Sequence, residues 1–495
     1  MSLNLFFNYY YYCNKMNIID QYCTLDGQVI WTCTLNQTNI KSNNNKFYIM
    51  QLIQESSSKH YYIFTRYGRV GYEGNNSLKE CINQESAESF FKRQFKNKTG
   101  NVWDPINNNK NFKRISGKYY LCIIEDPKMT IKENIKKIDK KPINIKPEVL
   151  DLIKLLSNKK QLNQTIRTLN IDTKRMPLGK ISKSQLDTAR DILNDIDKNL
   201  VNYNKDKLED LSSYFYTLIP YSCGMSVPPI INNKKFIGEL MNLLQDLSQI
   251  QITGQIIKNI NGDSNDELAE IYNKLDCKIV AMDPIKHKKH WDLLETYVKR
   301  THCPTHNFNP KILNIYQIQH SKQNNRYYSY LESNPELKKN KMLLFHGSKL
   351  GNWLGILNKS LLLFPSNVMI TGKMFGNGLY FASQSSKSMN YMGCHRSQPI
   401  GFLMLCEVAL GNQFKCNNSH YITDYNHLPK DTHSTWGMGK TTTDSNQYVR
   451  NKNGVVIPCG KLIDSNISGS LLYDEFIVYK EEQIRPAFLI KIKMF

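Results

Sequence analysis

The spacing of hydrophobic residues first indicates strands. Between Phe47 and Ile124, runs rich in Tyr, Ile and Phe are separated by breaks of Ser, Asn and Gly, with one helical stretch over residues 86–98. Aromatic and β-branched runs bounded by such breaks are typical of strands. We therefore expect a small mixed domain of strands and helix over residues 22–125, preceded by an N-terminal tail over residues 1–21.

Further along the chain, the spacing of apolar residues changes to that of a helix. A basic segment that contains proline comes first and suits a linker over residues 126–145. Hydrophobic residues then recur every three or four positions in two segments, namely Leu186, Ala189, Leu193, Ile196 and Leu200, and Ile237, Leu240, Leu244 and Leu247. Each segment has one apolar face, and Ser182 with Gln185 resembles a capping box. We predict an all-α bundle over residues 146–262.

The last part of the chain returns to strands. Apolar runs over residues 341–348, 401–411 and 471–480 alternate with Gly-rich connections. This pattern predicts a mainly β domain with a few helices over residues 263–495. The chain of 495 residues is long enough for about three domains. The predicted fold class is therefore multidomain α+β.

Composition and charge narrow the function classes. Lys and Arg number 65 against 43 Asp and Glu, which gives a formal net charge of +22. Such a surplus fits an anionic partner such as nucleic acid, although a solvated basic surface fits equally well. The N-terminus lacks the pattern of a secretory signal, and no segment approaches the roughly 18 apolar residues of a membrane span. We expect a soluble, non-secreted protein with no membrane partner.

Two short patterns resemble functional motifs but lack residues that those motifs require. None of the twelve cysteines stands in a CxxC pair, and Cys303 with His306 supplies only two ligands, so no metal site is expected. Residues 437–441 resemble the end of a phosphate-binding loop, but Ser434 occupies the position that requires the first glycine. The sequence therefore excludes a P-loop nucleotide hydrolase.

Several strings together carry a family resemblance. Residues 343–357, 371–392, 436–444 and 471–479 resemble the catalytic domain of the poly(ADP-ribose) polymerases, in the same order and at similar spacing. Upstream, two strings resemble the family's helical regulatory domain, and they cover residues 161–182 and 212–233. Three strings resemble its DNA-sensing WGR domain, and they cover residues 35–52, 67–74 and 95–103. The chain is similar to the short DNA-dependent members. The resemblance implies a small mixed WGR domain, an all-α regulatory bundle and a mainly β ADP-ribosyltransferase domain.

The resemblance implies a site for NAD+ as co-substrate. His346, Tyr380 and Glu475 would form the catalytic set, with Glu475 stabilising an oxocarbenium-like transition state as glycosidase carboxylates do. The Gly347 backbone and the Ser388 hydroxyl would hold the carboxamide. The remaining implied contacts are the rings of Tyr380 and Tyr391 around the nicotinamide, and His346 and Ser348 at the adenosine-side ribose.

A second set is implied for the growing polymer, and one position departs from the family. The acceptor-binding residues would be His306, Met374, Lys387 and Tyr473. The retained glutamate favours polymerisation over mono-transfer. Leu362 stands where the family has an arginine near the adenosine end of NAD+, so we expect either a lower affinity for NAD+ or a contact supplied by another residue.

The WGR-like segment carries the implied DNA contacts, which are Asn39, Lys46, Tyr67, Arg69 and Lys118. Tyr67 replaces the family's tryptophan and can still stack on a sugar or base. We expect a nuclear, monomeric glycosyltransferase that transfers and extends ADP-ribose on proteins, itself included, when it binds DNA ends or nicks, in DNA repair. The alternatives are a mono-ADP-ribosyltransferase or NAD glycohydrolase, and a silent DNA-end adaptor. An adaptor would have lost residues of the catalytic set, and none is lost.

Overall fold

The computed structural model describes residues 27–55, 60–104, 111–122, 145–159, 162, 182–257, 260, 264–363 and 373–495. They divide into two compact units. The first unit holds strands β1 to β5 with helices α2, α5 and α6, and the second holds α3 and everything from α7 onward. The units thus separate the helices predicted between residues 146 and 262. The predicted tail and all but the last residue of the predicted linker lie outside the described residues.

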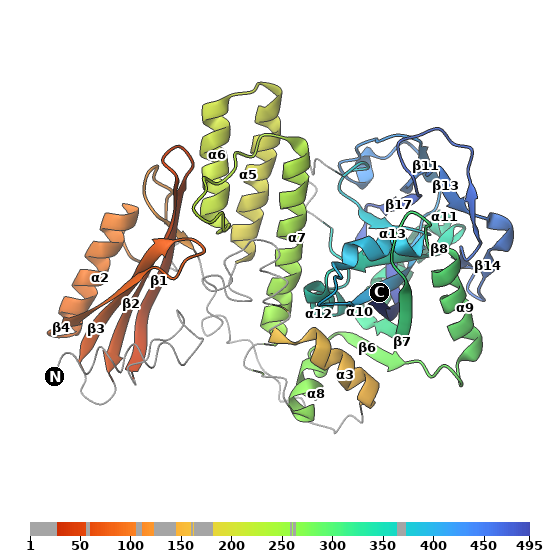
Figure 1. The fold of residues 1–495 in the computed structure, drawn as a ribbon, viewed down its shortest axis with the longest axis horizontal. Coiled ribbons are helices and arrows are strands. Elements are labelled where there is room, and N and C mark those ends of the chain that lie inside the picture. Colours follow the sequence, from red (N-terminus) through yellow and green to blue (C-terminus); the bar gives the residue numbers. More distant parts are fainter. Residues whose placement is uncertain are drawn as a thin grey trace. The chain divides into compact units, whose positions relative to one another are not determined.

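The first unit is built on a five-stranded antiparallel sheet in the order β4-β3-β2-β1-β5. Its elements are β1 (Gly27–Asn39), β2 (Asn44–Glu55), β3 (Tyr61–Arg69), β4 (Asn75–Cys81), α2 (Gln84–Thr99) and β5 (Tyr120–Cys122). Helix α2 lies along the sheet (Figure 1) and buries Phe91 and Phe95 against Leu35, Leu52 and Trp103. This confirms the predicted mixed domain.

Two helices complete the first unit, α5 (Lys183–Val201) and α6 (Lys205–Leu218). The predicted capping box is only half present, because Ser182 accepts from the Gln185 backbone N–H while the Gln185 side chain donates to the Leu218 carbonyl. Helix α6 is tied to the end of β1, since the Thr38 N–H donates to Thr217 Oγ1 at 3.0 Å. The sheet and helices of this unit are therefore joined by direct hydrogen bonds.

The second unit begins with helices and continues into strand-rich structure, as predicted. Its helices are α3 (Pro147–Leu156), α7 (Lys234–Ile256), α8 (Asn265–Asn273), α9 (Lys288–Arg300), α10 (Ser321–Ser333), α11 (Pro335–Lys338), α12 (Trp353–Lys359) and α13 (Ser385–Met389). Helix α7 packs closely on α12, where a Cβ added at Gly355 would lie 2.6 Å from the Gln249 carbonyl oxygen. The apolar residues of α7 predicted from their spacing are all buried.

Two larger sheets form the body of the second unit. One has seven strands in the order β14-β15-β8-β10-β18-β7-β6, and the other has four in the order β11-β12-β17-β9. The strands are β6 (Cys277–Ala281), β7 (Pro310–His320), β8 (Lys341–Ser348), β9 (Leu379–Phe381), β10 (Ile400–Ala409), β11 (Gln413–Cys416), β12 (Ser434–Gly437), β14 (Val449–Arg450), β15 (Val456–Ile457), β17 (Glu475–Val478) and β18 (Ile484–Met494). Strands β13 (Thr441–Thr443) and β16 (Leu462–Asp464) form a separate pair.

An isolated β-bridge joins the two large sheets. Phe345 on β8 and Ala382 after β9 exchange backbone hydrogen bonds of 2.9 and 3.0 Å. The Phe345 side chain is fully buried in a hydrophobic cluster with Tyr297 and Leu405. This junction brings the ends of β8 and β9 together, so residues that follow Phe345 lie beside residues that precede Ala382.

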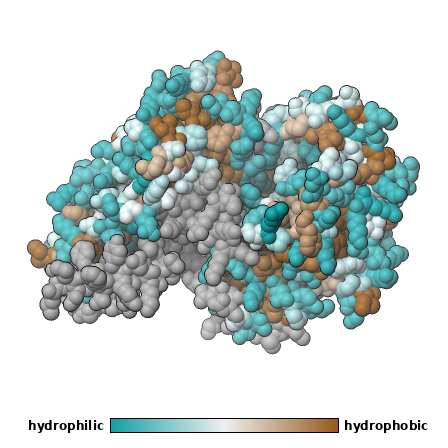
Figure 2. Space-filling view, in the orientation of Figure 1, coloured by the Kyte–Doolittle hydropathy of each residue, from teal (hydrophilic) through white to brown (hydrophobic). Residues whose placement is uncertain are grey.

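The surface contrasts with these cores. The face drawn in Figure 2 is mainly hydrophilic, with hydrophobic residues scattered in small groups. Among the helices that the structure describes, none combines the length and the apolar character needed to cross a membrane.

Candidate active site

His346 and Tyr380 meet at the junction of the two sheets. The His346 Nδ1 lies 3.0 Å from the Tyr380 carbonyl oxygen. Because a carbonyl only accepts, Nδ1 carries the proton and Nε2 is left as an acceptor. Burial lowers the pKa of His346 to about 4, the bond to the carbonyl opposes this shift, and the charge of Lys373 adds to it. The imidazole is therefore neutral near pH 7 and offers an acceptor to a hydroxyl group.

The Tyr380 ring is fixed by its hydroxyl group. That hydroxyl accepts from the Phe375 N–H at 3.1 Å and donates to the Gly376 carbonyl at 3.0 Å. Burial holds the pKa of Tyr380 well above its ordinary value. With both hydrogen-bonding functions engaged by backbone, the side chain presents its ring rather than its polar tip.

Glu475 begins β17 and forms an ion pair with Lys387. The Glu475 Oε1 and Lys387 Nζ lie 3.0 Å apart, and both side chains are about 15% exposed. Lys387 Nζ also donates to the backbone carbonyls of Tyr473 at 2.8 Å and Asp474 at 3.1 Å. Burial lowers the pKa of Lys387 and the Glu475 charge opposes that shift. The ammonium group thus has three fixed acceptors and orients the carboxylate.

Sequence reasoning missed Asp474, the neighbour of Glu475. Its carboxylate is buried and accepts from Trp436 Nε1 at 3.1 Å, the Gly439 N–H at 2.9 Å and Thr442 Oγ1 at 2.5 Å. Burial raises its pKa, and these three donors act against that shift. Asp474 therefore fastens the segment 436–442 to the start of β17. An acidic residue within the apolar run 471–480 was the feature of the sequence that could have indicated a structural role for Asp474.

The segment that resembled a phosphate-binding loop thus has a structural role. A Cβ added at Gly439 would lie 2.4 Å from the Tyr473 carbonyl carbon, so the loop approaches β17 closely only because this residue is glycine. Lys440 is exposed. The described residues contain no group of three or more His, Cys, Asp or Glu that could hold a metal ion.

The residues implied for the carboxamide lie together. A Cβ added at Gly347 would lie 1.8 Å from the Ser388 carbonyl oxygen, so only glycine permits this contact between β8 and α13. The Ser388 Oγ donates to the Phe345 carbonyl at 3.1 Å, which leaves its oxygen free to accept from an amide.

Tyr391, in the short helix η2 (Asn390–Met392), is 62% exposed. Ser348 Oγ accepts from Asn352 Nδ2 at 2.9 Å.

Three of the residues implied for acceptor binding, His306, Tyr473 and Lys387, lie close together. The His306 and Tyr473 rings lie 5.5 Å apart, and Lys387 donates to the Tyr473 carbonyl. Met374 packs in the hydrophobic cluster that contains Tyr380, and its role in acceptor binding stays a prediction. Two residues that were not predicted hold the imidazole, since His306 Nδ1 contacts Ser386 Oγ at 2.8 Å and Nε2 contacts Asn390 Nδ2 at 2.9 Å.

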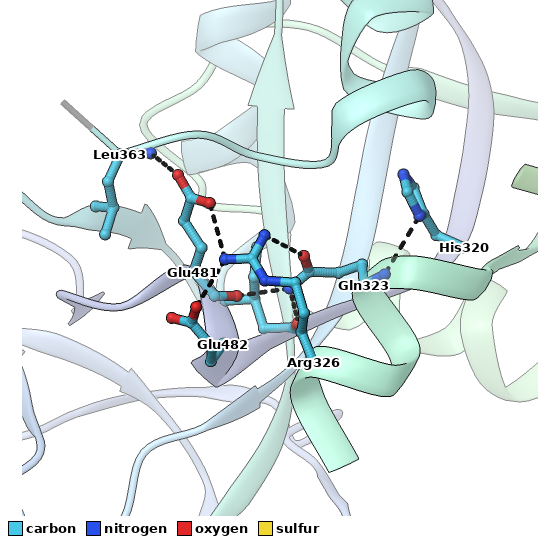
Figure 3. Close-up of polar contacts among 7 residues, drawn as sticks. His320, Gln323, Arg326, Leu363, Glu481 and Glu482 are labelled. Atoms are coloured by element: carbon cyan, nitrogen blue, oxygen red, sulfur yellow. Dashed lines mark hydrogen bonds and ion pairs between the residues drawn. The ribbon is translucent and has the colours of Figure 1, made fainter. Parts of the chain in front are cut away.

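The position of Leu362 lies in a well-anchored segment. The Leu363 N–H donates to Glu481 Oε1 at 2.8 Å, and Arg326 bonds both Glu481 and Glu482, at 3.1 and 2.7 Å (Figure 3). Gln323 supports the same turn through the carbonyls of Glu481 and Ile484. The guanidinium group of Arg326 is thus engaged by two carboxylates.

The residues implied for DNA lie in the first unit. Tyr67 is 43% exposed and stacks on Tyr48 with ring centroids 5.9 Å apart. Lys46 Nζ lies 5.6 Å from the Tyr119 ring, and Lys98 Nζ, not predicted, lies 4.6 Å from the Tyr48 ring. Burial lowers the pKa of Lys98, as does the nearby Lys46 charge. Tyr67, Tyr48, Tyr119, Lys46 and Lys98 thus form a basic aromatic patch.

The other implied DNA residues are engaged locally. Asn39 Oδ1 accepts from the Ser42 N–H at 3.1 Å, and Lys118 Nζ donates to the Asn97 carbonyl at 3.2 Å. Arg69 donates to the carbonyls of Gly224 and Ser226 at 2.7 Å, and to the backbone and side-chain oxygens of Asn43. Arg69 therefore bonds the segment that leads to α7, and its contact with DNA stays a prediction.

Comparison with known proteins identifies the domains. The WGR domain model matches residues 31–110, the poly(ADP-ribose) polymerase regulatory domain model residues 144–277, and the poly(ADP-ribose) polymerase catalytic domain model residues 288–494. The chain therefore carries the catalytic domain of an NAD+ ADP-ribosyltransferase.

Full-length relatives show the family. The chain is 34% identical over 483 residues to poly(ADP-ribose) polymerase 1 of Gallus gallus, covering 94% of this chain and 45% of that protein. It is 32% identical over 491 residues to poly(ADP-ribose) polymerase 2 of Homo sapiens, covering 95% and 80%, and 31% identical over 487 residues to poly(ADP-ribose) polymerase 2 of Arabidopsis thaliana, covering 96% and 75%. The chain belongs to the poly(ADP-ribose) polymerase family. It spans about half the length of the polymerase 1 relatives.

Proposed function

We propose that the protein is an NAD+ ADP-ribosyltransferase that transfers and extends ADP-ribose on protein acceptors when it binds broken DNA. The observation that carries this proposal is the Glu475 carboxylate, held by Lys387 at the start of β17. Strand β17 pairs with β9 through Ile477 and Tyr380, and β9 in turn meets β8 beside His346. Three strands thus assemble the proposed catalytic set.

The residues present fit NAD+ as substrate. A planar carboxamide needs one acceptor and one donor, which Ser388 Oγ and the Gly347 backbone would supply. The neutral His346 accepts through Nε2, which suits a ribose hydroxyl. The exposed Tyr391 ring and the fixed Tyr380 ring would provide flat walls for the nicotinamide.

Glu475 would act on the ribose that is transferred. NAD+ supplies an electrophilic ribose carbon whose bond to nicotinamide breaks, with the bonding electrons leaving on nicotinamide. A fixed carboxylate stabilises positive charge that develops on that carbon and accepts a proton from a nearby hydroxyl. Lys387 keeps the carboxylate in place and is itself held by the carbonyls of Tyr473 and Asp474.

The residues next to Glu475 support the proposal that the protein extends an ADP-ribose polymer. The ring of His306 lies against Tyr473, and both adjoin the Lys387 and Glu475 pair. An incoming ADP-ribose unit bound there would present its hydroxyl to the carboxylate. Burial lowers the pKa of His306, so this imidazole would bind as a neutral hydrogen-bonding group.

Dependence on DNA is proposed from the first unit and from α7. The basic aromatic patch offers a ring for stacking and two ammonium groups for phosphates, which suits DNA ends of any sequence in a nuclear protein. In the second unit, Asp246 on α7 accepts from Lys349 Nζ at 2.7 Å and Asn352 Nδ2 at 2.6 Å, and Asn352 also bonds Ser348. We propose that α7, so attached beside the NAD+ residues, restrains the site until DNA binds.

The proposal is tested by incubating the full chain with labelled NAD+, with and without nicked or blunt 5′-phosphorylated duplex. We expect label on protein, a ladder of increasing length on a gel, and a strong increase with duplex. A single short product would indicate mono-transfer and contradict extension. Free ADP-ribose without labelled protein would indicate a glycohydrolase, and an absence of turnover would indicate a silent adaptor.

A further inference from the structure

His306 is held at both ring nitrogens by one short segment of the second unit. Its Nδ1 lies 2.8 Å from Ser386 Oγ, and its Nε2 lies 2.9 Å from Asn390 Nδ2. Ser386 belongs to α13, and Asn390 begins the short helix η2 that follows it. Ser386 is fully buried, whereas Asn390 is exposed. Of the two contacts on the ring, only the one at Nε2 is therefore accessible to a substrate.

The partners of the imidazole decide which nitrogen carries its hydrogen. An amide nitrogen can only donate, so Asn390 Nδ2 donates and Nε2 accepts. Burial lowers the pKa of His306, and the nearby His302 and Lys387 lower it further, so the ring is neutral near pH 7. A neutral ring whose Nε2 accepts carries its hydrogen on Nδ1, which donates to Ser386 Oγ.

Ser386 is suited to hold this tautomer. Its Oγ also accepts from the Cys303 N–H at 2.7 Å, so both lone pairs of the hydroxyl oxygen are used. The hydroxyl hydrogen serves the Cys303 thiol, since burial raises the pKa of that thiol and a hydrogen bond from Ser386 opposes the rise. No hydrogen is left for Ser386 to donate to Nδ1, which disfavours the opposite tautomer.

The pair of His306 Nε2 and Asn390 Nδ2 has the polarity of a hydroxyl site. A hydroxyl group placed between them would donate to Nε2 and accept from Nδ2, which replaces one hydrogen bond by two. An ionised phosphate oxygen carries no hydrogen, so it would place its lone pairs against the lone pair of Nε2. We propose, on the basis of the proposed function, that His306 and Asn390 together bind a ribose hydroxyl group of the incoming ADP-ribose unit, and that Ser386 is the positioning residue that fixes the tautomer.

The location of this pair suits the extension step. The His306 ring lies 5.5 Å from the Tyr473 ring, and the Tyr473 hydroxyl lies 2.6 Å from Thr305 Oγ1, so both rings are fixed. The Tyr473 carbonyl accepts from Lys387, which holds Glu475. A ribose anchored through one hydroxyl at His306 can turn another toward the Glu475 carboxylate. Residues that bind only the incoming unit affect extension more than the first transfer to protein.

The test measures chain number and chain length on the full chain with saturating nicked duplex and labelled NAD+. Digestion of the product by a phosphodiesterase gives both, because terminal and internal units yield different nucleotides. We expect Ser386→Ala and Asn390→Ala each to lower the ratio of internal to terminal units about 3- to 10-fold, as the loss of neutral hydrogen bonds implies, with a smaller fall in chain number. In a His306→Ala background, Ser386→Ala should cause no further loss, because it acts through that ring.

Ser385→Ala is the matched control. Ser385 is equally buried in the same helix, and its Oγ donates to the Val298 carbonyl at 2.7 Å. The change removes the same kind of group, so it should alter stability without altering the ratio of internal to terminal units. A second measurement follows the ring itself. Long-range ¹⁵N spectra, assigned by comparison with His306→Ala, should show the hydrogen on Nδ1 in the wild type and partly on Nε2 in Ser386→Ala.

Other outcomes overturn the inference. A wild-type ring with its hydrogen on Nε2 would offer a donor and could not accept from a hydroxyl. An unchanged ratio in Asn390→Ala, or an equal loss in Ser385→Ala and Ser386→Ala, would show that these residues only support the fold. If Ser386→Ala does not fold, Asn390→Ala, which changes an exposed side chain, and the wild-type ring spectrum decide the matter. Should the wild type attach single units only, the proposed extension itself fails, which is distinct from a wild type that extends and variants that extend equally well.

Discussion

Removal of the Asp246 carboxylate is expected to release activity without DNA. The side chain is 14% exposed and accepts one hydrogen bond from the Lys349 ammonium group and one from the Asn352 amide. A hydrogen bond to a buried charge contributes about 1.5–3 kcal/mol. The Lys349 side chain is 37% exposed, so its ion pair adds at most about 1 kcal/mol after screening by water.

The expected magnitude follows from these contributions. We take the contacts of Asp246 to stabilise the position of α7 beside Ser348 by about 2–3 kcal/mol. Asp246→Ala should then raise the fraction of molecules in which α7 has moved away from the site by roughly 30- to 150-fold. NAD+ turnover without DNA should rise by up to this factor, with the turnover of the DNA-bound wild type as its ceiling. Asp246→Asn keeps an acceptor without the charge and should give a smaller increase.

The assay is NAD+ turnover by the full chain with and without saturating nicked duplex. Glu239→Ala is the control, because Glu239 is an exposed acidic residue on the same helix. Turnover with DNA should be equal in all variants. The reasoning is refuted if Asp246→Ala stays as silent as the wild type without DNA, or if both turnover values fall together, since the network would then support Ser348 instead of restraining the site.

Four further predictions follow from named contacts. Glu475→Gln should retain binding of benzamide and reduce transfer about 10²-fold; long polymer from this variant would contradict the catalytic assignment. Asp474→Ala should lower kcat much more than it raises KM, while Asp474→Asn, whose carbonyl oxygen can accept from Trp436 and Gly439 and whose amide can donate to Thr442 Oγ1, should restore most of kcat; equal activity of both variants would exclude a positioning role. Arg69→Ala should reduce stimulation by DNA and spare the turnover measured without DNA, and an equal loss of both would refute a role of Arg69 in the response to DNA. DNA affinity should fall steeply with salt and little with sequence, and Lys98→Met should reduce the salt slope by about one counterion; an unchanged slope would remove Lys98 from the interface.

Several features of the chain were predictable because they depend on local sequence. The spacing of Ile237, Leu240, Leu244 and Leu247 predicted a helix with one buried face, and all four residues are buried in α7. Strand β8 was likewise predicted, and it ends at Ser348. Such features follow from the helical period and from side-chain alternation, which operate over a few residues. The resemblance of several strings to the WGR, regulatory and catalytic domains of the family is confirmed by the family models.

Other features required the tertiary structure because they join distant residues. The Gln185 side chain bonds Leu218 instead of closing a capping box, since a partner 33 positions away competes with the local one. Met374 and Tyr380 pack against the same hydrophobic cluster, a contact that their sequence positions do not encode, and the place of Met374 in the acceptor set stays a prediction. The roles of Asp474 and Lys98 were missed because their partners come from other segments.

The sequence by itself determined which chemical groups the protein has and in which local elements they lie. The sequence alone shows His346 at the end of a strand, Glu475 within an apolar run and the basic WGR-like segment. Only the tertiary structure decided which of these groups meet, because the pairs of Lys387 with Glu475 and of Lys349 with Asp246 lie 88 and 103 positions apart in the chain. Such contacts depend on how sheets and helices pack, and no local period encodes them.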